Sequence, residues 1–263
     1  MIEQLTAQQR KIAYLIGIVV LMLPIIGLGM PGSDDETAYS GKLARLRQEY
    51  DLGESTLGAV DPTSATIHHA YGESLGTRGR LDESIAEIRR ASALDPLSGR
   101  IAVGLGFMLT NAKRFDEAIA ALTHGIELDP DQTLARLDLA RAYRLAGMAD
   151  LAIAESQRML ASGDPLGPAF LAASYGRAGR KADALVIVKG MIDKAQQSHQ
   201  GGLLIALVFA ALGDRDQAFH WLEQAYTEHD TFLPWLKVDP EFDIMRADPR
   251  FEELVHRIGI PAR

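Results

Sequence analysis

ATIHHAYGESLGTRGRLDESIAEIRRASALDP, residues 65–96, and GRIAVGLGFMLTNAKRFDEAIAALTHGIELDP, residues 99–130, follow one pattern. Both end in Leu-Asp-Pro, and the closing prolines, Pro96 and Pro130, lie thirty-four residues apart. Each stretch predicts a helix, a turn of small residues and a second helix. Proline closes each unit because it cannot continue a helix and disfavours helical geometry in the residue before it. The interval therefore indicates stacked helical hairpins.

Three later segments repeat the pattern with small shifts: LDLARAYRLAGMADLAIAESQRML (137–160), FLAASYGRAGRKADALVIVKGMI (170–192) and LLIALVFAALGDRDQAFHWLEQAY (203–226). Each has a small residue in the first helix, an aromatic residue three positions later and a glycine at the turn. These are Ala140, Tyr143 and Gly147; Ala172, Tyr175 and Gly179; and Ala206, Phe209 and Gly213. Closely crossing helices need small side chains where their backbones approach. We therefore expect the three alanines to be buried between helices.

These positions resemble the tetratricopeptide repeat family from about Thr63 to Asp230. The tryptophan often found near a repeat start is absent, and His68 and Ala102 stand there instead. The resemblance implies an all-α fold, a right-handed superhelix of about five helix-turn-helix repeats. It also implies a concave groove that binds a protein or peptide segment.

The C-terminal region 231–263 is expected to cap the last repeat. VDPEFDIMRADPRFEEL (238–254) contains Asp-Pro-x-Phe twice, at Asp239 and Asp248. Each aspartate suits a helix N-cap and each proline the first helical turn, with Phe242 and Phe251 facing inward. Residues 212–260 also resemble the C-terminal end of bacterial tetratricopeptide repeat proteins that carry a kinase, cyclase or DNA-binding domain upstream.

The N-terminal stretch IAYLIGIVVLMLPIIGLGM, residues 12–30, contains no charged residue. As a helix, nineteen residues would cross about one hydrocarbon core. Arg10 and Lys11 precede it and acidic residues follow, which places residues 1–11 in the cytoplasm. The prediction is a single-pass cell-membrane protein, with residues 31–62 as a juxtamembrane spacer and a periplasmic C-terminal domain. The alternatives are a cleaved signal peptide and a buried soluble helix.

Composition limits the chemistry. The chain has no cysteine, which excludes disulfides, thiolate metal sites and a cysteine nucleophile. Residues 31–263 contain 25 basic and 34 acidic residues, a net charge of −9. Phosphate backbones would be repelled by such a surface, so nucleic acid is not an expected partner.

No catalytic, cofactor or metal site is expected. GESLG, residues 72–76, matches the Gly-x-Ser-x-Gly motif of serine hydrolases, but that motif works on a turn between a strand and a helix. Here Ser74 is expected in the middle of a helix. VGLGF, residues 103–107, lacks the third glycine and the strand of a phosphate-binding loop. The histidines show no metal-ligand spacing. We therefore expect that the protein is not an enzyme.

The remaining candidate site is the concave groove that the resemblance implies. Mapping the family's groove positions gives candidate partner-binding residues, four of them arginines: Arg100, Phe107, Asn111, Arg141, Arg144 and Arg177. Arginine binds carboxylates through two parallel hydrogen bonds, so the hypothesis is a partner segment of acidic character. The alternative is that these arginines pair with acidic residues of the protein itself. On the first hypothesis, reversing Arg141 and Arg144 to glutamate should weaken partner capture without unfolding the domain.

Three functional hypotheses follow. The first is a membrane-tethered protein–protein interaction scaffold on the non-cytoplasmic face, in envelope assembly, secretion or protein quality control. The second is a regulatory or sensor module that works with a signalling partner encoded elsewhere. The third, a minor alternative, is a serine hydrolase that uses Ser74.

Overall fold

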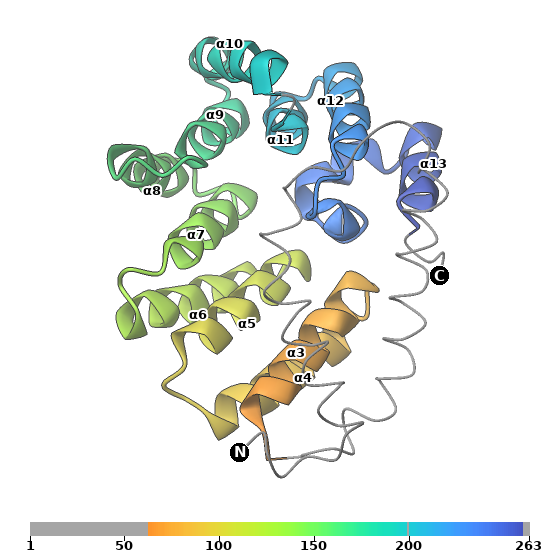
Figure 1. Cartoon of the computed structure of the whole chain (residues 1–263). Helices are drawn as coiled ribbons and strands as arrows, with labels where there is room; N and C mark the ends of the chain where they lie inside the picture. The colour runs from red at the N-terminus through yellow and green to blue at the C-terminus, as the bar shows by residue number, and fades with distance from the viewer. Residues whose placement is uncertain (1–62, 199, 260–263) are drawn as a thin grey trace.

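The computed structural model describes residues 63–198 and 200–259, which hold only helices and turns. Five antiparallel helical hairpins follow one another along an arc (Figure 1). They are α3 (Ala65–Thr77) with α4 (Leu81–Leu94), α5 (Gly99–Asn111) with α6 (Phe115–Leu128), α7 (Thr133–Leu145) with α8 (Ala149–Ala161), α9 (Gly167–Arg177) with α10 (Lys181–Ser198), and α11 (Gly202–Leu212) with α12 (Arg215–Thr227). The all-α prediction of about five repeats is confirmed for this part of the chain.

Small residues let the two helices of a hairpin approach closely. A Cβ added at Gly72 would lie 2.4 Å from Ile88 Cγ1, and one at Gly106 would lie 2.4 Å from Leu122 Cγ. No side chain fits at such distances, so glycine is required at this position of the first two repeats. The predicted alanines of the later repeats, Ala140, Ala172 and Ala206, are fully buried.

The turn inside each hairpin adopts the left-handed backbone conformation. Four of the five equivalent positions are glycines with φ between 76° and 80°: Gly79, Gly147, Gly179 and Gly213. Lys113 occupies the second position with φ 59°. A side chain in this region costs about 1–2 kcal/mol relative to glycine, so the lysine is a local exception to the repeat pattern.

The chain turns back after the fifth hairpin. Two short 3₁₀ helices, η2 (Leu233–Trp235) and η3 (Pro240–Met245), lie inside the arc, and α13 (Pro249–Arg257) packs against α12 (Figure 1). The predicted N-caps are confirmed, since the Asp239 side chain accepts a hydrogen bond from the backbone N–H of Glu241, and the Asp248 side chain accepts one from the backbone N–H of Arg250. Phe242 and Phe251 are buried as expected.

The region from residue 231 onward thus does more than cover the end of the stack, because η2 and η3 contact helices of earlier repeats. In residues 63–198 and 200–259, no helix is both long and apolar enough to span a membrane. The predicted membrane helix over residues 12–30, its flank at 1–11 and the spacer at 31–62 lie outside the described residues.

Candidate binding groove

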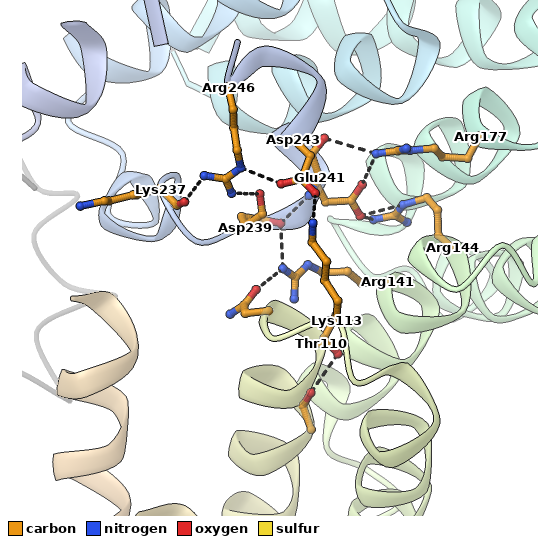
Figure 2. Close-up of polar contacts among 12 residues, drawn as sticks. Thr110, Lys113, Arg141, Arg144, Arg177, Lys237, Asp239, Glu241, Asp243 and Arg246 are labelled. Atoms are coloured by element: carbon orange, nitrogen blue, oxygen red, sulfur yellow. Dashed lines mark hydrogen bonds and ion pairs between the residues drawn. The ribbon is translucent and has the colours of Figure 1, made fainter. Parts of the chain in front are cut away.

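The inner face of the arc is built from the first helix of each repeat. Phe107 and Asn111 lie one turn apart on α5, Arg141 and Arg144 lie one turn apart on α7, and Arg177 is the last residue of α9. Helical spacing of three or four residues places each pair on one face. All five side chains approach residues 233–246, here called the inner segment, directly or through a neighbour. Figure 2 shows the three arginines beside this segment.

Glu241 of the inner segment lies between two arginines. Arg144 Nε donates to Glu241 Oε1 over 2.9 Å, and Arg144 Nη2 donates to the same oxygen. Arg177 Nη2 donates to the Glu241 backbone carbonyl over 3.3 Å and lies 3.6 Å from Oε2. The Arg144 and Glu241 side chains are 0% and 1% exposed, so both charges are removed from water and depend on each other.

Asp239 makes the second polar contact of the inner segment. Arg141 Nη2 donates to Asp239 Oδ1 over 2.7 Å and also to Asn111 Oδ1. The same Asp239 oxygen accepts the backbone N–H of Glu241 over 2.9 Å, which caps η3. Asp239 therefore both begins the short helix and fixes it to α7.

Apolar contacts extend this attachment to the first repeats. The rings of Trp235 and Phe107 meet edge to face with centroids 4.9 Å apart. A Cβ at Gly76 of α3 would lie 3.1 Å from the Trp235 ring, so this glycine leaves room for the tryptophan. Leu236 and Met245 of the inner segment are fully buried. Since η3 also packs against α11, the inner segment bridges from α3 to α11.

An ion pair closes the edge of the groove nearest α5. Lys113, the residue that replaces a turn glycine, places Nζ 2.6 Å from Asp243 Oδ2. Arg246 Nε donates to the other Asp243 oxygen over 2.6 Å, and Arg246 Nη2 donates to the Asp239 carbonyl over 3.1 Å. Arg246 holds the inner segment in its folded shape, while Lys113 attaches it to the repeat stack (Figure 2).

Asp138 lies one turn before Arg141 and is also buried. Burial raises its pKa to about 7, Arg141 opposes this shift, and Asp239 adds to it. Arg141 therefore faces two carboxyl groups whose negative charges repel each other. The buried Asp138 carboxyl group therefore keeps its proton up to about neutral pH.

Arg100 stands apart from the other candidate residues. It lies at the start of α5, is exposed, and places Nη1 3.0 Å from Nδ1 of the buried His69. Burial, and then the nearby Arg100 charge, lower the pKa of His69 to about 4. The imidazole is therefore neutral near pH 7 and accepts the arginine hydrogen bond.

The inner face remains open beyond the inner segment. Thr66, Arg100 and Leu134 occupy equivalent positions of the first three repeats and are all exposed. Arg100 lies seven residues before Phe107, and Leu134 seven residues before Arg141, which places them two turns along the same helical face. We call these three residues the open strip. The groove is thus filled at one end of α5 and α7 and accessible at the other.

The structure corrects one sequence-based expectation. Arg141 and Arg144 cannot be reversed to glutamate without destabilising the domain, because each would then place a second carboxylate against Asp239 or Glu241 in a buried site. The structure brings five of the six predicted groove residues together at the inner segment, and their binding of a partner stays a prediction. Their acidic counterparts Asp239, Glu241 and Asp243 were not predicted. The available signals were the acidic spacing in Asp-Pro-Glu-Phe-Asp and a lysine where the other turns have glycine.

Ser74 lies in the middle of α3 and is buried, as the position of its motif in the repeat predicted. Its hydroxyl therefore has neither the strand-to-helix turn nor the exposure of a hydrolase nucleophile. In residues 63–198 and 200–259, no three histidine, aspartate or glutamate side chains gather closely enough to hold a metal ion.

Comparisons with known proteins agree with this architecture. A family model described as tetratricopeptide repeat matches residues 109–169. A tetratricopeptide repeat protein from Parabacteroides merdae is similar in structure with TM-score 0.60 and 13% identity, over 94% of this chain and 84% of that chain. PilW, a widely conserved type IV pilus biogenesis factor, is similar with TM-score 0.53 and 20% identity, over 77% and 96%.

PilF of Pseudomonas aeruginosa is similar with TM-score 0.50 and 20% identity, over 77% of this chain and 95% of that chain. No curated protein matches the sequence. The family match and the structural neighbours support the assignment of the five hairpins to the tetratricopeptide repeat fold.

Proposed function

We propose that this protein is a tetratricopeptide repeat scaffold, tethered to the membrane through residues 12–30, that binds a segment of another protein on the inner face of its arc. The observation that carries the proposal is that this face already holds a linear segment, residues 233–246, through arginines on successive repeats. A surface that binds one such segment has the spacing and the charges to bind another.

The open strip is the proposed contact surface. It offers an exposed arginine beside an exposed leucine, so it suits a segment with both acidic and apolar side chains. The proposed setting is envelope assembly on the non-cytoplasmic face. The charge asymmetry around residues 12–30 supports that orientation, and the description of PilW as a pilus biogenesis factor supports that setting.

The test is site-specific photocrosslinking of the full-length protein in its own cells. A photoreactive amino acid replaces Thr66, Arg100 or Leu134 of the open strip, and in control variants it replaces Leu185 or Val186. Both control residues are exposed on α10, a second helix that lies on the outside of the arc (Figure 1). We expect a discrete adduct from the open strip and none from α10. Equal labelling at both places, or no adduct at either, would contradict the proposal.

Membrane tethering is tested separately. The protein should remain in the membrane fraction after an alkaline carbonate wash, and protease added to cells with a permeabilised outer envelope should digest residues 63–259. Release by carbonate, or protection from the protease until the inner membrane is broken, would overturn the proposed location while leaving the binding proposal intact.

A further inference from the structure

The inner segment is attached differently from the residues on either side of it. It joins α12 to α13, and these two helices contact each other independently of the groove. Arg250 Nη2 donates to Asp216 over 2.9 Å, and Arg257 Nη1 donates to Glu223 over 3.0 Å. Release of the inner segment would leave these α12–α13 contacts in place, and it would uncover Leu236 and Met245 of the shared hydrophobic core.

Any segment that fills the groove must supply acidic side chains to the buried groove arginines. Arg144 is fully buried and Arg141 nearly so, and the carboxylates that bond to them, Glu241 and Asp239, both come from the inner segment. A filling segment without these acids would leave the buried guanidinium group of Arg144 without its charged partner, which is strongly destabilising. The arginines therefore select for acidity, and the Trp235 contact with Phe107 adds an apolar anchor.

Lys113 supports a binding role for this attachment. It is the position among the five turns where glycine is replaced, despite the backbone strain, and its amine contacts Asp243. Strain that persists at one copy of a repeated feature indicates a requirement specific to that copy. Here that requirement is contact with the inner segment.

From these contacts we infer that the inner segment is an intramolecular ligand of the groove, displaced by a partner segment of the same chemistry. That partner presents an aromatic residue followed directly by an aliphatic one, as in Trp235-Leu236. Its first acidic residue lies four positions after the aromatic residue, and its second acidic residue two positions later, as Asp239 and Glu241 do. The inference rests on the proposed function and extends it: the open strip makes first contact, and exchange of the segment then exposes the arginines.

The probe is a fluorescent peptide with the sequence of residues 231–246, titrated against the full-length chain and measured by anisotropy. In the wild type the tethered segment competes at an effective concentration in the millimolar range, so binding is weak. The double variant D239N/E241Q loosens the tethered segment and leaves the groove arginines intact. We expect this variant to bind the peptide at least about tenfold more tightly, which corresponds to about 1.4 kcal/mol.

The control peptide carries asparagine and glutamine in place of the two acids and should bind neither protein. A variant that keeps the wild-type helical circular dichroism but binds the acidic peptide no better than the wild type does would overturn the inference. Equal binding of the acidic and the control peptide would overturn it as well, because the arginines would then not select for acidity.

A second experiment does not depend on the stability of that variant. Because the chain has no cysteine, K113C/D243C provides a unique pair across a contact whose side chains are 58% and 33% exposed. A short bismaleimide joins the two thiols and fixes the inner segment in the groove. The bridged protein should lose peptide binding that the unbridged protein retains. Unchanged binding after bridging would contradict the inference.

The two proposals can fail separately. If photocrosslinking gives adducts from the open strip but the peptide does not exchange with the inner segment, the scaffold proposal stands and the inference of an intramolecular ligand is wrong. Peptide exchange without adducts in cells would remove the scaffold proposal instead.

Discussion

Replacing Glu241 by alanine probes the contact on which the groove depends. The Arg144 side chain is 0% exposed and receives its charge compensation from Glu241, with Nε to Oε1 at 2.9 Å. Removing one partner of a buried pair costs about 3–5 kcal/mol, because the other charge stays buried without a counter-ion. The neighbouring Ser174 hydroxyl, 3.4 Å from Arg144 Nη1, offers only a weak neutral contact.

The matched control is Glu83→Ala. Glu83 accepts two hydrogen bonds from Arg80 at 2.7 and 2.6 Å, but the two side chains are 60% and 42% exposed. An ion pair with equally short hydrogen bonds contributes little to stability when it is exposed to water, so the control should unfold at nearly the wild-type temperature. The assay is thermal and urea unfolding followed by circular dichroism.

For a domain of this size, 1 kcal/mol shifts the midpoint by about 2–4 °C, so Glu241→Ala should lower it by roughly 10 °C. Replacing Arg144 and Glu241 together by methionine should recover part of that loss. Equal small shifts for Glu241→Ala and Glu83→Ala would refute the reasoning, because they would mean that Arg144 is solvated.

Three further predictions concern the repeats and the groove. Gly106→Ala should destabilise the domain by about 1–3 kcal/mol, because its Cβ would overlap Leu122. Gly190→Ala in α10, where no atom lies within 4 Å of the added Cβ, should stabilise it by about 0.5–1 kcal/mol; urea unfolding of both variants tests the difference in sign. Asp138 has a folded pKa of about 7, above its ordinary value of 3.8, so the stability that depends on its protonation is present at low pH and lost as pH rises from 3.8 through 7. Asp138→Asn should therefore be more stable than the wild type at pH 8, with the advantage shrinking toward pH 4, and a constant difference across this range would contradict the burial argument. Lys113→Gly relieves about 1–2 kcal/mol of left-handed backbone strain and removes a partly exposed ion pair that contributes less than this, so the variant should unfold at the same or a higher temperature. Its inner segment should nevertheless exchange amide hydrogens faster than in the wild type, and slower exchange would count against the assigned role of the lysine.

The repeat architecture could be predicted from the sequence because its cause is local. Gly72 and Gly106 must be small for their helices to meet, and the same requirement recurs thirty-four residues later. Because this steric requirement recurs in every repeat, it produces a periodic pattern of small residues that can be recognised in a single sequence. The positions of Ala140, Ala172 and Ala206 follow from the same rule.

The occupant of the groove could not be predicted in the same way. Arg144 and Glu241 are ninety-seven residues apart in the chain, and nothing periodic links them. The sequence suggested that the arginines bind acids, and it left open whether those acids belong to the protein itself or to a partner. In the structure the chain turns back into the arc after α12, so that Asp239 and Glu241 of the protein itself are the acids that bind Arg141 and Arg144.

The helix caps at Asp239 and Asp248 were predictable because capping depends on a few consecutive residues. The same aspartate, Asp239, also binds Arg141, and this second role is tertiary. Local chemistry thus identified the residue without showing its long-range function.

The central claim is that the inner segment lies in the groove, and zero-length carbodiimide coupling of the unmodified full-length protein tests it most directly. This reagent joins an amine to a carboxylate only when they are in contact, and Lys113 Nζ lies 2.6 Å from Asp243 Oδ2. Mass spectrometry of the digested monomer should show an intramolecular amide between Lys113 and Asp243. If Lys113 is coupled only to other carboxylates, or Asp243 only to other lysines, the inner segment does not occupy the groove and the account is contradicted.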